Sequence, residues 1–153
     1  MIRYMMKEDY KAVRELWEKT EGFHIRKLDD SQTNIEKLLE RNPRMSIVAE
    51  NNGEIVGSVL CGHDGRSGML YHICVDKLYR RQGIGTAMVE KAVCALKREG
   101  IGTVLLIAFS DNKAGNQFWN KIGWRKREDI NFYDYTLNPS NTIKIVAEVQ
   151  ENI

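Results

Sequence analysis

Residues 75–86 combine residue types and spacing that suit an anion-binding turn. Their sequence, Val-Asp-Lys-Leu-Tyr-Arg-Arg-Gln-Gly-Ile-Gly-Thr, joins a β-rich run to a segment with helical spacing. The start of a helix directs unpaired backbone N–H groups and the positive end of the helix dipole at one point, where a phosphate or pyrophosphate can bind. We expect glycine to be needed at positions 83 and 85, because a Cβ would hold the phosphate off the backbone or forbid the required φ. Arg80 and Arg81 add charge nearby.

Two familiar phosphate-binding motifs do not fit this stretch. A Walker loop needs a lysine followed by Ser or Thr after its last glycine, and a dinucleotide-binding fingerprint needs a third glycine where Met88 stands. The pattern that remains, Arg-x-x-Gly-x-Gly over residues 80–85, lies after a strand and before a helix. It resembles the pyrophosphate-binding signature of the GNAT N-acetyltransferases.

Residues 111–124 carry a second resemblance to that family. They are similar to its Asn-x6-Tyr-x3-Gly-Phe segment, with Asn112 in the place of the asparagine and Phe118-Trp119 in the place of an aromatic–tyrosine pair. The resemblance spans about residues 1–137. Further short segments look like a subgroup of small bacterial and archaeal single-domain members.

The resemblance implies an acyl-CoA enzyme with acetyl-CoA as co-substrate and no metal. In that family the fourth and fifth strands splay apart to admit pantetheine, whose amides pair with the backbone of one strand. The cofactor-binding residues that it implies here are Ile73, Cys74, Val75, Arg80, Arg81, Gln82, Gly83, Ile84, Gly85, Thr86, Asn112, Phe118 and Trp119.

Acetyl transfer from a thioester to an amine depends more on a base than on an acid. An amine with a pKa of about 10.4 costs roughly 4.6 kcal/mol to deprotonate at pH 7. The leaving thiol, by analogy with cysteine, has a pKa of about 8.5, so its thiolate needs less help from an acid in order to leave. We therefore expect loss of a general base to reduce activity more than loss of a general acid.

The β-like run 69–75 contains two candidates for that base. His72 titrates near neutrality and lies three residues before Val75, close to where related enzymes place a base or a base-bound water. A hydrogen-bonded core histidine is the alternative interpretation. Tyr71 is the second candidate, either as a relay to the base or as a wall of the acceptor pocket. Direct attack by the amine needs no covalent intermediate, so Cys74 is not expected to act as a nucleophile.

Position 119 departs from the family pattern. The tyrosine that usually protonates the leaving thiolate is Trp119 here, and an indole N–H donates a hydrogen bond but no proton near neutral pH. Either Trp119 stabilises the sulfur, or it packs along the CoA channel while another tyrosine replaces the acid. Tyr133 and Tyr135 are the nearest candidates by topology.

Polar residues in two loops have two interpretations each. Asp64 and Arg66 precede the strand that carries His72, where they either bind charged ends of the acceptor or form a solvated turn. His24, with Phe23 and Arg26, lies in a loop that overhangs the acceptor site in this fold. It either contacts the acceptor or is an ordinary loop residue.

The first elements that must position these residues are a strand and two helices. Residues 2–5 are β-like, and apolar side chains at helical spacing follow Asp9, which we expect to cap that helix. A loop over 22–30 leads to a second helix, capped by Ser31 and ending before Pro43.

Three strands follow. The β-rich runs 46–50 and 54–61 flank an Asn-Gly pair, which predicts a hairpin. A glycine-rich turn over 62–68 leads to the run 69–75, whose simple alternation places His72 on one face with Leu70 and Cys74.

The later elements complete a mixed α/β domain. We predict a helix over 85–98, a strand over 103–109 buried on both faces, and a short helix over 116–121. Two further β-like runs cover 130–137 and 142–149. Together these elements predict one GNAT domain over residues 1–153, with helices on both faces of a mixed, mostly antiparallel sheet of six to eight strands and splayed fourth and fifth strands.

Composition narrows the class of protein. The chain has 153 residues, 42% hydrophobic and 29% charged, and its net charge of +2 gives no support to nucleic acid or an anionic membrane as the main partner. No stretch approaches a membrane span or an export signal, and Cys61, Cys74 and Cys94 lie in apolar runs that predict buried, reduced thiols. We expect a cytoplasmic protein.

Two functions from different classes remain at this stage. The first is an N-acetyltransferase that transfers the acetyl group of acetyl-CoA to a primary amine on a small molecule or peptide, by direct attack. The second is a catalytically weak or inactive module that binds or senses acyl-CoA. The run 142–149 either closes the sheet or crosses to a second subunit. Of these alternatives we favour the second, in a homodimer.

Overall fold

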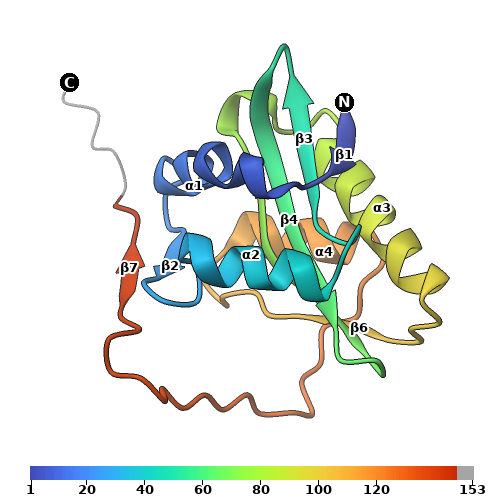
Figure 1. The fold of residues 1–153 in the computed structure, drawn as a ribbon. Coiled ribbons are helices and arrows are strands. Elements are labelled where there is room, and N and C mark those ends of the chain that lie inside the picture. Colours follow the sequence, from blue (N-terminus) through green and yellow to red (C-terminus); the bar gives the residue numbers. More distant parts are fainter. Residues whose placement is uncertain (148–153) are drawn as a thin grey trace.

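The computed structural model describes residues 1–147, in which seven strands are divided between a central sheet and a small ribbon (Figure 1). The central sheet has the order β1-β3-β4-β5-β6, and its last pair is parallel while the others are antiparallel. Its strands are β1 (Ile2–Tyr4), β3 (Ile47–Asn51), β4 (Glu54–His63), β5 (Gly68–Val75) and β6 (Val104–Leu106). The ribbon pairs β2 (His24–Arg26) with β7 (Ile143–Ile145).

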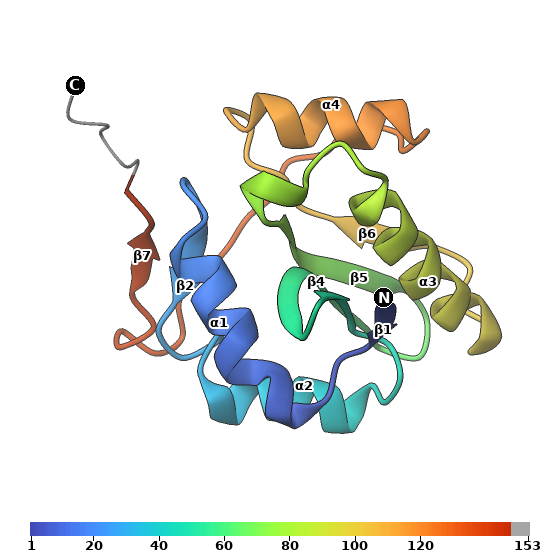
Figure 2. The same cartoon turned by 90° about the horizontal axis from the view of Figure 1, so that it is seen from above.

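Helices cover both faces of the central sheet (Figure 2). One face packs against α1 (Tyr10–Glu18) and α2 (Gln32–Arg41), and the other against α3 (Ile84–Arg98) and α4 (Lys113–Lys121). Each face has its own core cluster, one around Trp17 and one around Met88. Short 3-10 turns at Lys7–Asp9 and Lys77–Tyr79 precede α1 and α3.

Local signals explain most element boundaries. Asn52 and Gly53 have φ values of 50° and 81°, the left-handed pair that a two-residue hairpin needs. Ser31 caps α2 by accepting a hydrogen bond from the Asn34 N–H, as predicted. The prediction for Asp9 is wrong in detail, because its carboxylate accepts from the Met6 N–H and from Arg3 instead of capping α1.

A β-bulge in β5 changes the predicted facing of its side chains. The register pairs Cys74 with Ser58 but Tyr71 with Leu60, so that two residues of β5, 72 and 73, oppose one of β4. His72 sits in this bulge with a φ of 49°. As a result Leu70 joins the α3–α4 core cluster and Cys74 the α1–α2 cluster, and the simple alternation that placed both on one face is wrong.

The strands β5 and β6 splay apart, as the family resemblance implies. They pair only between Gly68–Leu70 and Val104–Leu106. From Tyr71 and Ile107 onward the two strands separate, and we call this opening the fork. The prediction that residues 103–109 are buried on both faces is wrong. Alternate side chains pack against the α3–α4 cluster, whereas Leu105, Ile107 and Phe109 are 50–53% exposed because β6 is the last strand of the sheet.

The region after α4 differs most from the sequence prediction. Residues 130–137 form no strand, and their large apolar side chains are 59–90% exposed. The run 142–149 contributes β7, which pairs with β2 inside the predicted loop 22–30 and not with the central sheet; the end of that run lies outside the described residues. Within residues 1–147, no helix is long and apolar enough to cross a membrane.

Candidate active site

The turn before α3, residues 80–86, has the conformation that an anion-binding site requires, and we call it the cradle. Gly83 precedes the helix with a φ of 79°, and Arg81 also lies in the left-handed region with a φ of 62°. Ala87 donates the first hydrogen bond of the helix to the Gly83 carbonyl, so the N–H groups of residues 84–86 have no partner within the helix. These groups and the dipole of a 15-residue helix point at one place.

The two glycines of the cradle serve different purposes. A Cβ on Gly83 would meet nothing within 4 Å, so glycine is favoured there by its positive φ alone. Gly85 has no positive φ, so of the two reasons expected for glycine the φ requirement applies to Gly83 alone. A Cβ on Gly85 would touch the Phe118 ring at 3.4 Å and Val75 at 3.7 Å, so its absence keeps space between β5 and α4.

Arg80 ties the cradle to the end of β5. Its Nε donates a hydrogen bond to the Val75 carbonyl at 2.9 Å. This carbonyl belongs to the backbone that the family resemblance assigns to pantetheine. Asp76, next along the chain, caps the short turn through the Leu78 N–H, and a hydrogen bond from Lys19 lowers the pKa of its carboxyl.

The first residues of α4 and its aromatic pair lie on the same side of the sheet as α3. Asn112 caps α4 by accepting from the Gly115 N–H at 3.0 Å, which engages its side-chain oxygen. Phe118 meets Trp119 edge to face at 4.9 Å, and Trp124 lies 4.9 Å from Trp119 on another side. Trp119 is 9% exposed and belongs to the core cluster, so packing is the role that its contacts describe.

On the opposite face of β5, His72 lies in a cage of side chains from three other segments. Its Nε2 is 2.7 Å from the Asp30 Oδ1, and its ring lies 4.9 Å from Trp17 and 4.8 Å from Phe23, measured between centroids. The His72 side chain is 24% exposed and that of Asp30 is 6% exposed. The imidazole is therefore held firmly but is still accessible.

Asp30 is itself fixed in place through its backbone and its second carboxylate oxygen. Its Oδ2 accepts from the Arg26 N–H at 2.7 Å, and its carbonyl accepts from the Tyr10 hydroxyl at 2.7 Å and from Arg14 at 3.3 Å. On the other side of His72, the Ser58 hydroxyl accepts from the Trp17 indole N–H and donates to the His72 carbonyl. Hydrogen bonds therefore hold both the side chain and the backbone carbonyl of His72, which stabilises the strained bulge.

This arrangement defines what His72 can do chemically. An aspartate that faces Nε2 favours the tautomer with the proton on Nε2, which leaves the lone pair on Nδ1 free to accept a proton. A histidine oriented by a buried carboxylate is a recurring design for a general base.

Tyr71 stands at the fork between the splayed strands. It is 40% exposed, and it shares a face with Leu60, on the side of α1 and α2. Burial raises the pKa of its hydroxyl above the ordinary tyrosine value, so the group stays protonated near neutral pH. It suits the wall of a pocket or a hydrogen-bond donor better than a base.

The segment before and within β2 bridges the two splayed strands. Phe23 contacts His72 of β5, and the His24 ring stacks on Phe109, just beyond β6, with 3.8 Å between centroids. The segment therefore lies across the opening between β5 and β6, and His24 is engaged there with an aromatic ring. The neighbouring Arg26 contributes its backbone N–H to Asp30.

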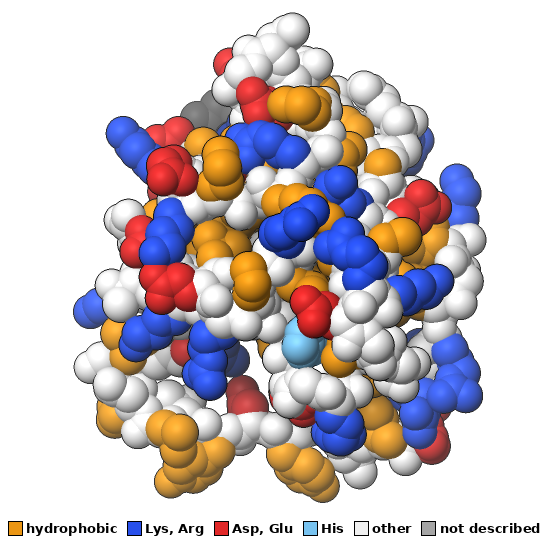
Figure 3. All heavy atoms as spheres, turned by 45° about the vertical axis from the view of Figure 1, so that its right-hand side comes forward, with side chains coloured by type: hydrophobic (Ala, Val, Ile, Leu, Met, Phe, Trp, Pro, Cys, Tyr) orange, Lys and Arg blue, Asp and Glu red, His pale blue; other side chains and the backbone are white. Residues whose placement is uncertain are grey.

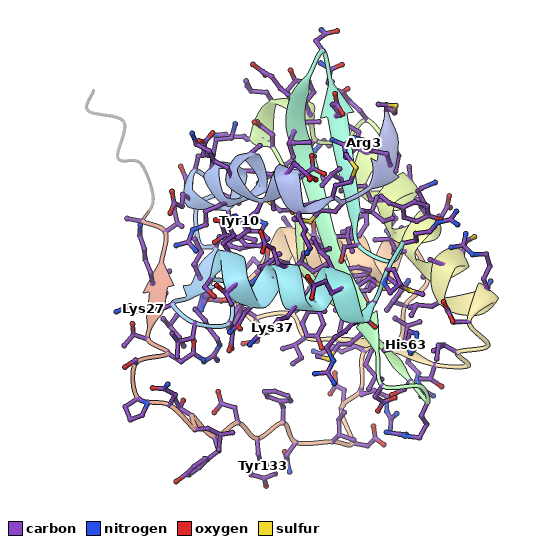
Figure 4. All side chains as sticks on the ribbon, viewed as in Figure 1. Arg3, Tyr10, Lys27, Lys37, His63 and Tyr133 are labelled. Carbon is purple, nitrogen blue, oxygen red and sulfur yellow. The ribbon has the colours of Figure 1, made fainter. Side chains whose placement is uncertain are left out.

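Asp64 and Arg66, two residues predicted to contact the acceptor, lie away from His72 and the fork. The Asp64 carboxylate accepts from the N–H groups of Arg66 and Ser67, both at 2.8 Å, in a turn at the end of the sheet where β5 and β6 are paired and not where they open. Figure 4 places His63, the last residue of β4, at that lower end. The solvated-turn interpretation of Asp64 and Arg66 is the correct one.

The tyrosines proposed to replace the missing acid do not reach the site. Tyr133 and Tyr135 are 84% and 87% exposed, and Figure 4 shows Tyr133 on the extended segment, apart from the sheet. The prediction failed because the run 130–137 forms no strand.

The cysteines take no part in this chemistry. Burial raises the pKa of Cys61 to about 12 and that of Cys74 to about 11, which keeps both thiols protonated. Cys94 lies on the solvent side of α3 and is exposed, so the prediction of three buried thiols is wrong for this one. No group of three His, Cys, Asp or Glu side chains in residues 1–147 is arranged to hold a metal ion.

Asp30 is the functional candidate that the sequence did not reveal. It lies immediately before the helix cap Ser31, where aspartate is common for reasons of turn formation alone. Its partner His72 is 42 residues away, and no local pattern joins them. On the face that Figure 3 presents, basic and acidic side chains are interspersed.

Comparison with known proteins agrees with this geometry. The model of the acetyltransferase (GNAT) family matches residues 7–124. An acetyltransferase of Pectobacterium atrosepticum is 35% identical over 121 residues, which are 79% of this chain and 84% of that protein.

Two solved structures have a similar fold. The PaiA N-acetyltransferase of Thermoplasma acidophilum, in complex with coenzyme A, has a TM-score of 0.72 and 18% identity, covering 86% of this chain and 92% of that one. AAC(6')-Iy in complex with a bisubstrate analogue has a TM-score of 0.68 and 16% identity, covering 89% and 97%. The predicted mixed α/β GNAT fold is confirmed, although the central sheet of residues 1–147 has five strands instead of six to eight.

Proposed function

This chain belongs to the GNAT acetyltransferase family, and from that premise we propose that it is an acetyl-CoA-dependent N-acetyltransferase acting on a primary amine. The observation that carries the proposal is the junction made by β5. His72, which Asp30 contacts, lies three residues before Val75, and the Val75 carbonyl accepts a hydrogen bond from Arg80 of the turn before α3. A proton acceptor on β5 and an anion site in the turn that follows this strand therefore both come after the place along β5 where β5 and β6 separate.

The residues present fit acetyl-CoA. The free N–H groups at the start of α3 suit its pyrophosphate, and Arg80, Arg81 and Gln82 lie in the same turn. The edge of β5 from Ile73 to Val75 lies beyond its pairing with β6, which leaves it for the pantetheine amides. The space that Gly85 keeps beside Phe118 suits the pantetheine arm. When bound there, acetyl-CoA supplies a thioester carbonyl that an amine can attack.

His72 handles the proton of the acceptor in this proposal. Its Nδ1 accepts a proton from the ammonium or from the attacking amine, while a C–N bond forms and the C–S bond breaks. Asp30 stabilises the resulting imidazolium. The thiol is acidic enough that its thiolate leaves without a side-chain acid, so the replacement of tyrosine by Trp119 is tolerated. Tyr71 lines the acceptor pocket.

The buried indole of Trp119 favours a second candidate function. A core residue in the place of the usual acid is also what a CoA-binding module without turnover would have. The two functions differ in whether any amine is acetylated. The narrower expectations, a cytoplasmic single domain over residues 1–153 with a small-molecule or peptide acceptor and no nucleic-acid partner, belong to the first candidate.

A thiol-release assay with acetyl-CoA against a panel of amines tests the proposal. The panel spans a polyamine, an aminoglycoside, an amino acid and a peptide, and calorimetry of CoA binding runs beside it. We expect turnover with at least one amine, near wild-type turnover in Tyr71→Phe, and CoA binding in both proteins. Tight CoA binding with no turnover would favour the sensing module, and absence of CoA binding would exclude both functions.

A further inference from the structure

Asp30 has more contacts than a turn residue requires. Its carboxylate is almost fully buried, and each of its oxygens has a partner, Oδ1 at the His72 Nε2 and Oδ2 at the Arg26 N–H. Its backbone carbonyl is held by the Tyr10 hydroxyl and by Arg14. A carboxylate that is buried and fixed this firmly determines the orientation of the group that it faces.

His72 needs such a partner because the backbone alone does not orient it. Its φ of 49° lies in a region that non-glycine residues rarely adopt, and its ring lies against both Trp17 and Phe23, which stack on each other. The aromatic rings fix the plane of the imidazole but give no preference between its two nitrogens. The aspartate supplies that preference.

We propose that Asp30 is the positioning residue of this site, and that it holds His72 in the tautomer whose Nδ1 accepts the proton of the amine. This inference rests on the proposed function for its chemical purpose, although the tautomer itself does not. The charged and titratable groups that contact the pair of Asp30 and His72 are Tyr10 and Arg14 from α1, and both bind the Asp30 carbonyl.

The test compares Asp30→Asn with Asp29→Asn. Asp29 is the adjacent aspartate, with a 59% exposed side chain that lies 3.9 Å from Arg26, and within residues 1–147 it makes no hydrogen bond or ion pair with the imidazole. We expect Asp30→Asn to lower kcat about 10- to 100-fold with an unchanged KM for acetyl-CoA. Asp29→Asn is expected to stay within twofold of the wild type on both measures.

A spectroscopic readout separates positioning from mere stability. In protein labelled with 15N at histidine, the ring nitrogens of His72 should show the proton on Nε2 in the wild type and in Asp29→Asn, and a mixture of tautomers in Asp30→Asn. An Nδ1-protonated wild type, or an unchanged spectrum and rate in Asp30→Asn, would overturn the inference. Because the spectrum needs no substrate, it decides the matter even if the chain acetylates no amine.

A second, independent observation concerns the free edge of β6 and the segment 128–141. The edge lies along an open groove that is lined by Thr103, Val104 and Leu105, by Val93 of α3, and by Trp124, Arg125 and Arg127. Leu105, Ile107 and Phe109 are half-exposed beside it. A sheet edge of this kind pairs readily with a further strand.

The segment 128–141 contains residues of the types that form β-strands, and it could supply a strand to pair with the edge of β6. It is anchored at one end by residues 125 and 127 in the groove and at the other by Asn141, which accepts from the N–H groups of Leu28 and Asp29. Between these anchors the side chains of Ile130, Phe132, Tyr133, Tyr135 and Leu137 are 59–90% exposed. Figure 3 shows hydrophobic side chains along the lower edge of the molecule, where Figure 1 places this segment apart from the sheet.

We infer that a second copy of this chain covers both surfaces, with residues 130–137 of each copy paired to the β6 edge of the other. Six aromatic side chains, three from each copy, at about 150–250 Å² each would bury on the order of 1,000 Å², close to the size of a stable interface. The exchange is reciprocal, so it closes as a dimer.

Sedimentation velocity of two variants tests this pairing. Tyr133→Asp with Tyr135→Asp disables the segment, Ile107→Asp disables the edge, and Leu78→Asp, at an 83% exposed position elsewhere, is the control. We expect a dimer for the wild type and the control, and a monomer for each disabled protein alone. A mixture of the two disabled proteins should regain heterodimers, since one intact segment still meets one intact edge. A monomeric wild type, or dimers that survive both changes, would overturn the inference.

Discussion

The cradle before α3 and the cage around His72 both adjoin β5, but they are formed by different kinds of chemical group. The cradle consists of backbone N–H groups presented by seven contiguous residues, 80–86, with positive φ at Arg81 and Gly83. The cage consists of side chains from α1, the segment before α2, and β5. The first binds any ligand with the right charge and shape, whereas the second depends on the position of a few atoms. Changes in the two regions should therefore affect different constants.

The largest effect is expected from removing the imidazole. His72→Gln should lower kcat/KM by about 10²- to 10⁴-fold, the usual contribution of a general base, with the Kd for CoA within twofold of the wild type. Steady-state kinetics and calorimetry on one preparation measure both. An equal loss of CoA affinity would mean that the two regions are not separate.

The next effect concerns the cradle. Gly83→Val places a β-branched residue at a φ of 79°, which costs about 1–2 kcal/mol. We expect CoA binding to weaken about fivefold to thirtyfold while kcat at saturating acetyl-CoA is maintained. Gly65→Val is the matched control, since Gly65 has a φ of 89° with equally open surroundings in the remote β4–β5 turn. Equal weakening of CoA binding in both variants would assign the effect to general destabilisation.

A smaller effect should follow from loosening the segment that holds Asp30. Ser31→Ala removes the cap of α2 and costs about 1 kcal/mol, which lowers the thermal midpoint by about 2–4 °C in a domain of this size. Because Asp30 directly precedes the cap, we expect kcat to fall severalfold with CoA affinity unchanged. Calorimetric melting and the thiol-release assay check this, and an unchanged kcat would show that the cage tolerates a frayed helix.

The smallest effect is expected from alkylation of the thiols. With the pKa values of Cys61 and Cys74 raised to about 12 and about 11, their reactive thiolates are scarce at pH 8 and become abundant only as the pH rises toward those values. Iodoacetamide at pH 8 should therefore modify Cys94 alone and leave activity intact. Mass spectrometry of the treated protein identifies the modified residue; rapid loss of activity with label at Cys74 would contradict the buried position of this thiol.

The contrast between the regions also explains how far the sequence could be interpreted. The cradle was predictable because its requirements, glycine at a positive φ and a strand before a helix, are imposed on neighbouring residues. The hairpin at Asn52-Gly53 and the Ser31 cap were predictable for the same reason. Even here one contact was beyond local patterns, since the side chain that a Cβ at position 85 would meet is Phe118 from another helix.

The cage was beyond local patterns. The bulge at His72 inverts the facing of β5, and nothing in the run 69–75 marks where a one-residue insertion falls. Asp30 resembles any turn-forming aspartate until the fold brings it to a histidine 42 residues away. The exposed run 130–137 shows the converse limit, because a β-like composition forms a strand only where an edge is within reach.

The ratio of wild-type to His72→Gln rates, measured as a function of pH with one amine acceptor, tests the central claim most directly. If His72 removes the proton of the acceptor, the ratio should be largest near pH 7 and should shrink toward one as the pH approaches the pKa of the amine, where the neutral nucleophile forms without help. A weakly basic amine should show a small ratio already at pH 7. A ratio that stays constant across pH and acceptors would contradict the account and leave His72 a structural residue of the cage.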